Sequence, residues 1–274
     1  MKFSLIVATL NRKKELDILL LSLKQQKYKN FEVIIVDQNK NLIDNIVKKY
    51  SDIIDIKHIK VDFKGLSKAR NIGLRSIIGD IVAFVDDDCE YLPDTLTKVY
   101  DKIEKEGIDI LSTKIIDKYS LEDVGIKWGR NEKIINKNNM FKNSMSASLF
   151  INTKILKNIF FDENFGVGAK YGSAEESDYL LKLLKQSPKT LYTPDIYIYH
   201  PLHQNIFDLQ KEFNYAKGLG AFYKKHIKEY SNFLILLKIF IKPAIGIVLN
   251  FYNNNSLKYL MILKGRIYGF FKYR

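Results

Sequence analysis

Hydrophobic positions in the first half of the chain alternate between two spacings, which predict strands and helices in turn. Continuous apolar runs at Phe3 to Thr9 and Phe31 to Asp37 are typical of buried strands. Leucines at positions 16, 19, 20 and 23 recur at helical spacing and form one apolar face. The other expected elements are helices over 43–50, 65–78 and 94–106 and strands over 56–61, 81–86 and 108–112. This order predicts an α/β fold with a mostly parallel sheet covered by helices.

Polar side chains follow three of the expected strands, at the point where each strand ends. Thr9, Asn11 and Arg12 follow the first strand, Asp37 closes the second, and an aspartate triplet at 86–88 closes the fourth. Ligands of parallel α/β sheets bind at the carboxyl ends of the strands. We therefore expect these side chains to lie along one edge of the sheet and to form a site there.

The second half of the chain is less regular. Between Lys114 and Asn143 the pattern fades into a polar stretch that holds the single tryptophan, Trp128. Glycines at 166, 168 and 172 then mark a glycine-rich loop. Around this loop we expect strands over 146–151 and 190–200 and helices over 174–184 and 206–227, although two glycines weaken the middle of the last helix.

Two apolar runs near the end of the chain, 233–251 and 257–271, differ in kind from the rest. The first is 19 residues long, close to the length that a membrane-spanning helix needs, but it contains Lys238, Lys242 and Pro243. A lysine at the centre of a spanning helix costs about 2.5–3.5 kcal/mol. The pattern therefore argues against a helix that crosses a membrane.

Composition adds charge and compartment to this picture. The 274 residues include 44 Lys and Arg against 31 Asp and Glu, and the formal net charge of +13 favours an anionic partner. A single cysteine, Cys89, excludes an internal disulfide and a multi-cysteine metal site. The N-terminal apolar run is short and enters a charged segment at once. We interpret it as a strand rather than a signal peptide, and we expect a cytoplasmic protein.

The aspartate triplet is the sharpest chemical signal in the sequence. Three adjacent carboxylates repel one another unless a cation lies among them, and oxygen ligands suit Mg²⁺ or Mn²⁺. Along an extended segment Asp86 and Asp88 point to the same side, where they can share one ion. The alternative is an acidic turn that caps the helix after Pro93.

Three weaker signals surround the triplet. Arg70 is able to offer a two-pronged hydrogen bond to phosphate, or it is an exposed cation at a helix start. Glu175 and Glu176 begin a helix together with Asp178, where carboxylates complement the helix dipole or act as a general base. His200 ends a strand and is suited to bind a metal, although a lone histidine is more often structural.

In this order and combination the motifs resemble those of the family 2 glycosyltransferases of the GT-A fold. The resemblance covers roughly residues 1 to 225, and the tail around Leu263-Lys264-Gly265-Arg266 is similar to that of some bacterial members. The matching stretches are SLIVATLNR (4–12), FEVIIVDQN (31–39), GLSKARNIGLRSIIGDIVAFVDDD (65–88), YGSAEESDYLLKLL (171–184) and YIYHP (197–201). It implies a GT-A sheet flanked by helices with a helical C-terminal tail. It also implies transfer of a sugar from a nucleotide-diphosphate donor, usually with inversion.

The resemblance also implies roles for individual residues. On the donor side, Asp37 would hydrogen-bond the base and Asp86 would contact the ribose or sugar. The other nucleotide-sugar-binding residues it implies are Thr9, Asn11, Arg12, Arg70 and Asp87. A metal ion, Mn²⁺ or Mg²⁺, would be bound by Asp88 with Asp86 and His200, as the DXD motif of the family implies. On the acceptor side the base would be Glu176, Glu175 or Asp178, near Gly172 and Trp128.

Three rival functions differ from this one in their sequence requirements. A dinucleotide-binding oxidoreductase would carry G-x-G-x-x-G after the first strand, where VATLNR stands instead. A nucleic-acid-binding module is disfavoured because no binding motif is present and the triplet would repel phosphate without a metal, so we expect no nucleic-acid partner. An inactive relative that only binds nucleotide-sugars or acts as a scaffold stays open as the alternative.

We therefore expect a catalytic domain over residues 1–227 and a basic amphipathic helical tail over 228–274. The tail has eight Lys or Arg and one acid. Basic residues among long apolar runs suit a helix lying on an anionic membrane, here on its inner face. The alternative is that these helices pack on the catalytic domain or on a second subunit. The expected donor is a UDP-sugar, and the expected acceptor is a glycan or a lipid-linked glycan of cell-surface polysaccharide synthesis.

Overall fold

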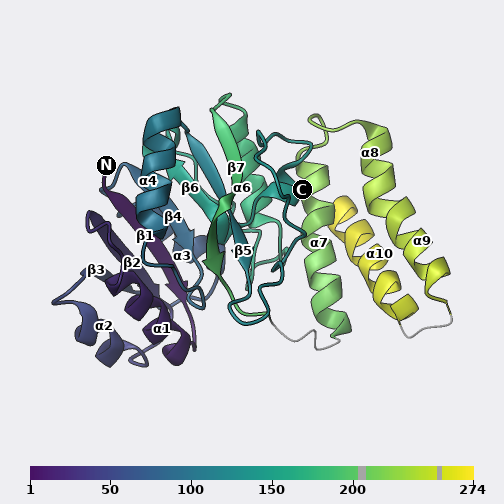
Figure 1. The fold of residues 1–274 in the computed structure, drawn as a ribbon. Coiled ribbons are helices and arrows are strands. Elements are labelled where there is room, and N and C mark those ends of the chain that lie inside the picture. The colour runs from purple at the N-terminus through teal and green to yellow at the C-terminus, as the bar shows by residue number, and fades with distance from the viewer. Residues whose placement is uncertain (203–207, 252–254) are drawn as a thin grey trace. The chain divides into compact units, whose positions relative to one another are not determined.

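The computed structural model describes residues 1–202, 208–251 and 255–274 (Figure 1). The chain divides into two compact units. The first unit contains residues 1–64, 68–160 and 179–203, which include every strand of the sheet. The second contains residues 65–67, 161–178 and 204–274. The expected tail therefore shares a unit with the preceding helix and with the glycine-rich loop.

The first unit is built on a seven-stranded sheet with the strand order β3-β2-β1-β4-β6-β5-β7. Strand β6 runs antiparallel to both of its neighbours, and all other pairs are parallel. The predicted mostly parallel sheet is confirmed. The strands are β1 (Phe3–Thr9), β2 (Phe31–Asp37), β3 (Asp55–Lys60), β4 (Ile81–Val85), β5 (Ile110–Ile116), β6 (Leu149–Asn152) and β7 (Thr190–Tyr199).

Helices cover this sheet, and their apolar stripes explain why they form. In α1 the four leucines at helical spacing are all fully buried. Helix α3 ends at Leu74, earlier than expected, and β5 continues four residues beyond the expected end at Ser112. The helices are α1 (Lys13–Lys24), α2 (Asp44–Tyr50), α3 (Leu66–Leu74), α4 (Thr95–Glu106), α5 (Met140–Asn143) and α6 (Glu175–Leu184).

The second unit is mainly helical. Helix α7 (Leu209–Lys225) starts inside the expected range, of which positions 206 and 207 lie outside the described residues. Helix α8 (Asn232–Leu236), a π-helical turn (Leu237–Ile241) and α9 (Lys242–Leu249) follow one another without a break. Helix α10 (Asn255–Lys272) packs against both α7 and α9, as Figure 1 shows.

Glycines allow α7 and α10 to approach closely. A Cβ atom at Gly220 would lie 2.1 Å from the backbone oxygen of Arg266, and one at Gly269 would lie 2.0 Å from that of Lys217. No side chain fits at such distances, so the two backbones touch only because these positions are glycine. Gly220 therefore lowers the helix propensity of α7 but allows α7 to pack closely on α10.

The end of α10 packs against the glycine-rich loop of the same unit. The rings of Phe165, Tyr171 and Tyr273 form a cluster with centroid distances of 5.4–5.8 Å. The Tyr171 hydroxyl donates a hydrogen bond of 3.1 Å to the backbone oxygen of Lys272. The last turn of the tail thus helps to order a loop about a hundred residues earlier in the chain.

One helical segment of the described residues, Asn232–Leu249, has the length and apolar composition of a membrane-spanning helix. Only 22% of it is buried within the protein. Core helices of soluble proteins and signal sequences can also have this length and composition, so these properties by themselves do not make it a spanning segment.

Candidate active site

The ends of β1 and β2 bring two buried polar residues side by side. Thr9 and Asp37 are register partners and both are fully buried. One Asp37 oxygen accepts hydrogen bonds from the backbone and side-chain nitrogens of Asn39, and the other lies 2.9 Å from His58 Nε2. Asn11 has a positive φ of 60° and donates its backbone N–H to Asn39. The Asp37 carboxylate is therefore held in one orientation.

The aspartate triplet forms a turn after β4. The prediction of an extended segment at residues 86–88 is wrong, because the backbone N–H of Cys89 donates 3.0 Å back to the oxygen of Asp86 and closes a turn. The side chains then find different partners: Asp86 pairs with Arg70, and Asp88 pairs with Arg12 and His200. Alternation along a strand is therefore no guide to which carboxylates share a ligand here.

Arg70 is one of the most buried charged groups near the triplet. It is 3% exposed, which rules out the alternative of a solvated cation at a helix start. Its Nη2 donates to Asp86 Oδ1 at 3.0 Å and to Ser146 Oγ at 2.9 Å. Ser146 has no sequence motif to identify it, because a hydroxyl 76 residues from its partner leaves no local pattern.

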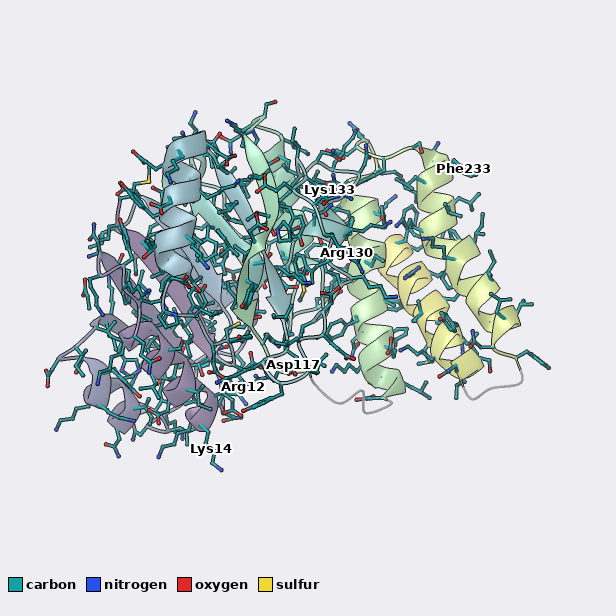
Figure 2. The ribbon with its side chains drawn as sticks, viewed as in Figure 1. Arg12, Lys14, Asp117, Arg130, Lys133 and Phe233 are labelled. Atoms are coloured by element: carbon teal, nitrogen blue, oxygen red, sulfur yellow. The ribbon has the colours of Figure 1, made fainter. Side chains whose placement is uncertain are left out.

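Asp88 lies between a cation and an imidazole. Glu90 and Tyr199 form an antiparallel bridge, which brings the triplet beside the end of β7. His200 Nε2 lies 3.2 Å from one Asp88 oxygen, and Arg12 hydrogen-bonds the other. Figure 2 shows Arg12 at the edge of the sheet where β1 ends.

These contacts shift the pKa values of both partners. Burial alone would raise the pKa of Asp88, but the hydrogen bond and charge of His200, with those of Arg12, hold it below its usual range. Burial alone would lower the pKa of His200, but the hydrogen bond and charge of Asp88 raise it. The neighbouring Asp87 differs, since burial raises its pKa to about 6. Within the triplet, Asp88 is thus the stronger acid and Asp87 the weaker one.

The donor atoms of Asp88, Cys89 and His200 lie within 4.8 Å of one another. Cys89 is fully buried, and burial raises the pKa of its thiol well above the ordinary value, so it stays protonated. His200 Nδ1 bonds the backbone oxygen of Pro201, which leaves Nε2 directed at Asp88. One carboxylate and one imidazole fit a divalent cation that takes its remaining ligands from a diphosphate.

A second group with donor atoms within 4.8 Å consists of Asp37, Asp44 and His58. The Nζ of Lys60 lies 2.6 Å from Asp44, and His58 bonds Asp37, so each carboxylate already has a partner of its own. We assign this group to the orientation of Asp37. His58 was not among the expected site residues. The sequence signal that could have identified it is a polar residue inside an expected strand, next to a buried aspartate.

The motif that we expect on the acceptor side begins at Ala174, whose φ of 71° is unusual for a residue with a side chain. Glu175 is 6% exposed and packs beneath Gly166, where a Cβ atom would lie 3.2 Å from its carboxyl carbon. Glu176 is more exposed than Glu175. Gly172 lies against the backbone of α7, with 3.0 Å from its would-be Cβ to the oxygen of Asn214. Glu176 is therefore the glutamate that solvent reaches more easily.

Asp178 is fully buried and is contacted by a lysine and a histidine of the same unit. Lys225 Nζ lies 2.7 Å from its Oδ1, and His226 Nε2 lies 2.8 Å from the same atom. Lys225 also pairs with Asp162 at 2.6 Å. These contacts make Asp178 an anchor for the start of α6, so we no longer include it among the candidate bases.

Trp128 packs inside the first unit. It is 6% exposed, stacks on Tyr192 with ring centroids 5.6 Å apart, and donates its indole N–H to the backbone oxygen of Val124 at 3.0 Å. Its ring and its polar atom are both used in packing. We therefore leave Trp128 out of the acceptor site that we propose below.

Comparison with known proteins identifies the family of this chain. The model of "Glycosyl transferase family 2" matches residues 4–165, more than half of the sequence. The chain belongs to glycosyl transferase family 2. An uncharacterised glycosyltransferase of Haemophilus influenzae is 30% identical over 197 residues, which are 69% of this chain and 64% of that protein. The aligned part therefore spans less than two thirds of the relative's length.

Another relative in this family is the GalNAc(5)-diNAcBac-PP-undecaprenol beta-1,3-glucosyltransferase of Campylobacter jejuni. It is 29% identical over 176 residues, which cover 60% of this chain and 56% of that protein. Two solved structures share the fold. S. aureus TarS 1-349 with UDP-GlcNAc has a TM-score of 0.64 and 19% identity, and the match covers 98% of this chain and 89% of that one. The mannosyltransferase PcManGT from Pyrobaculum calidifontis, with GDP-Man and Mn²⁺, has a TM-score of 0.69 and 14% identity. The match covers 98% of this chain and 86% of that one. The predicted GT-A fold is confirmed.

Proposed function

We propose that the protein is a metal-dependent, inverting glycosyltransferase that transfers a sugar from a UDP-sugar to a hydroxyl of a cell-surface glycan or lipid-linked acceptor. The observation that carries the proposal is the Asp88–His200 pair at the strand-end edge of the sheet, with its 3.2 Å contact. Beside it, Arg70 is buried and paired with Asp86. A carboxylate, an imidazole and a buried guanidinium at one edge suit a nucleoside diphosphate.

The chain's own residues would divide the work on the donor. Asp88 and His200 would hold a divalent cation, Mn²⁺ or Mg²⁺, which neutralises the charge that develops on the diphosphate leaving group. Asp37, held by His58 and Asn39, would accept a hydrogen bond from the base. Arg12 would exchange its bond with Asp88 for one with the bound phosphate, because both are anionic and the side chain is 39% exposed.

On the acceptor side, Glu176 would accept the proton of the attacking hydroxyl. A positioned carboxylate contributes typically 10²–10⁴-fold in such a step. Its greater exposure favours it over Glu175, whose side chain packs beneath Gly166. Attack opposite to the leaving group inverts the configuration at the sugar carbon.

The similar proteins support the choice of donor and acceptor. The TarS structure contains UDP-GlcNAc, and the mannosyltransferase structure contains GDP-Man and Mn²⁺. The Campylobacter relative is named for an acceptor linked through a diphosphate to undecaprenol. A lipid-linked acceptor would explain why the tail is basic and exposes apolar side chains, since such an acceptor lies in a membrane. We therefore propose that the protein works at the cytoplasmic face of the membrane, with residues 1–227 as the catalytic region and 228–274 as the tail.

Hydrolysis of nucleotide-sugars in a panel, with and without Mn²⁺, tests the proposal. We expect one UDP-sugar to be hydrolysed only with the metal, and Asp88→Asn to remove both hydrolysis and Mn²⁺-dependent donor binding. The control is Asp195→Asn, an exposed carboxylate on β7 that keeps activity. Unchanged hydrolysis in Asp88→Asn refutes the metal site. Donor binding without hydrolysis or transfer by the wild type favours the alternative of an inactive sugar-nucleotide-binding protein.

A further inference from the structure

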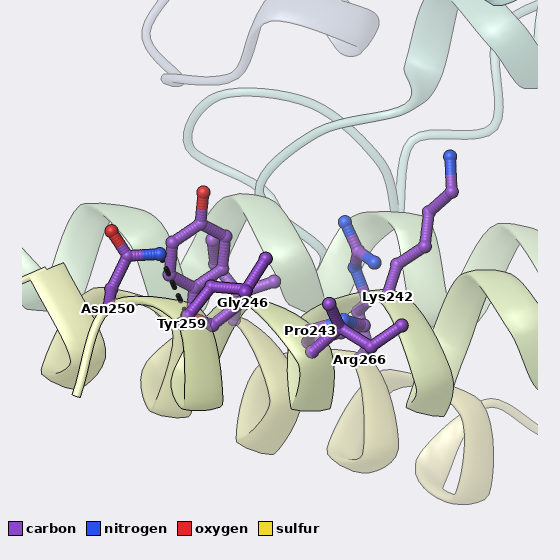
Figure 3. A pocket seen from close by; sticks show the side chains of 9 residues that line it. Lys242, Pro243, Gly246, Asn250, Tyr259 and Arg266 are labelled. Carbon is purple, nitrogen blue, oxygen red and sulfur yellow. Dashed lines mark hydrogen bonds between the residues drawn. The ribbon is translucent and has the colours of Figure 1, made fainter.

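A cavity of about 380 Å³ opens between α9 and α10 in the second unit (Figure 3). Its walls are largely apolar, and polar groups stand at its two ends. Lys242 and Arg266 form one end, and Asn250 and Tyr259 form the other, as Figure 3 shows. The apolar residues that line it are Pro243, Ile245, Leu249 and Ile262, with Gly246. Nothing in the proposed transfer reaction uses this cavity.

The cavity is positively charged. None of the described residues that line it is acidic, and no ion pair with a carboxylate forms at Lys242 or Arg266 within the described residues. By contrast, Lys258 on α10 pairs with Glu212 at 2.9 Å. The buried Nε of Arg266 has no hydrogen-bond partner among the described residues, and burial lowers the pKa of the guanidinium. A partly desolvated guanidinium of this kind favours an anion.

The position of Arg266 is set by the surrounding backbone. Its Nη1 donates to the backbone oxygen of Lys238, which belongs to the π-helical turn before α9. Such turns displace carbonyl groups from the regular helical pattern and are frequent at functional sites. The backbone of Arg266 also touches α7 at Gly220, as described above. These contacts hold the guanidinium at the cavity, so it does not move freely over the surface.

Exposed apolar side chains surround the same cavity. Ile245 and Leu249, which line it, are 51% and 76% exposed, and Val248 is 73% exposed. Phe233, at the start of α8, is 69% exposed (Figure 2). A soluble anion would gain nothing from these side chains. A molecule with a charged head and hydrocarbon chains would use both the cations and the apolar surface.

We propose that this cavity binds the phosphate headgroup of an anionic membrane phospholipid. This rests on the membrane contact proposed above and assigns it to one site. Lys242 and Arg266 contact the phosphate, while Ile245, Val248 and Leu249 meet the acyl-chain region. The charge is complementary, because the tail carries eight basic residues and one acid.

Vesicle co-sedimentation of the full chain tests the site. The probes are vesicles of phosphatidylcholine alone and of phosphatidylcholine with 30% phosphatidylglycerol, at fixed ionic strength. The test variant is Lys242→Gln, and the matched control is Lys264→Gln, which removes the same charge from an exposed position on α10 outside the cavity. We expect Lys242→Gln to weaken binding to the anionic vesicles at least fivefold more than Lys264→Gln does.

Equal losses in the two variants overturn the proposal, since diffuse attraction then accounts for binding. Binding that does not depend on phosphatidylglycerol also overturns it. Inorganic phosphate at 10 mM, balanced for ionic strength, is the competitor; if it releases the wild type completely, the site takes a soluble anion and not a lipid. Donor hydrolysis without vesicles is measured in parallel and stays unchanged in Lys242→Gln. If the wild type does not hydrolyse any donor, the transferase proposal is refuted, and the result on lipid binding still holds.

Discussion

Replacing Lys225 by methionine is expected to destabilise the protein strongly. Lys225 Nζ lies 2.7 Å from Asp178 and 2.6 Å from Asp162, and Asp178 is fully buried. Without the lysine, the buried Asp178 carboxylate loses its 2.7 Å contact with an ammonium group. Removing one partner of a buried ion pair costs about 3–5 kcal/mol. The nearby Asp162 loses the same partner, which adds to the effect.

Thermal unfolding at pH 7, followed by circular dichroism, measures this cost. A chain of this size shifts its Tm by about 2–4 °C per kcal/mol, so a fall on the order of 10 °C is expected. Lys224→Met is the matched control, because Lys224 is exposed next to Lys225, and it should change the free energy of unfolding by less than about 0.5 kcal/mol.

A double-mutant cycle isolates the pair itself. Asp178→Asn combined with Lys225→Met should cost less than the sum of the two single changes, because the double variant buries no unpaired charge at this position. A single-variant cost below about 1 kcal/mol, or strict additivity in the cycle, would show that the pair does not anchor α6. Turnover should fall together with stability while the donor KM is kept, since Asp178 positions the start of the helix that carries Glu176.

Glu176→Gln should lower turnover by about 10²–10⁴-fold in a transfer assay with the donor KM unchanged, and a larger loss in Glu175→Gln would move the base by one residue. Gly269→Ala should destabilise the protein by about 1–3 kcal/mol in urea unfolding, because its Cβ would lie 2.0 Å from a backbone oxygen of α7. Gly129→Ala is the neutral control, because a Cβ atom there would lie 3.5 Å from its nearest neighbour. Equal losses of stability in the two variants would refute the close-packing argument. Burial raises the pKa of Asp162, but its lysine partner outweighs this and lowers the pKa below the ordinary 3.8. The folded state therefore gains stability from this carboxylate above about pH 4 and loses it as the pH falls. The Tm difference between wild type and Asp162→Asn should shrink from pH 7 to pH 3, and a constant difference would contradict it.

Strands β1 and β2 have the bounds that the sequence predicts, because each is a mainly apolar run buried on both faces. Their polar residues Ser4 and Glu32 are buried as well and hydrogen-bond each other. Strand β5 is longer than predicted. Its continuation includes Lys114, which pairs with Asp123 at 2.8 Å and so tolerates a charged position in the strand. The antiparallel direction of β6 was not predictable, since a four-residue strand has the same pattern in either direction. Local patterns therefore predict where buried strands lie, and pairing decides the rest.

The candidate site shows the same division. Asp37, Asp88 and His200 were identified from their places at strand ends, and the parallel sheet brings such ends to one edge. Some partners of the site residues were not identified, such as Ser146, which accepts a hydrogen bond from Arg70 across 76 residues. The prediction failed at the triplet because it assumed an extended backbone, whereas one backbone hydrogen bond turns the chain. Contacts between residues far apart in sequence follow from the tertiary fold and not from spacing.

The ring cluster of Phe165, Tyr171 and Tyr273 sets an order of events during synthesis. The loop and the start of α6 leave the ribosome about a hundred residues before the helix end that packs on them. Contacts of such long sequence separation form late in folding. The strand-end residues that we propose for donor binding all lie within the first 200 positions. A nascent chain would thus form the proposed nucleotide site first, and its glycine-rich loop would be fully ordered only after the tail has been made.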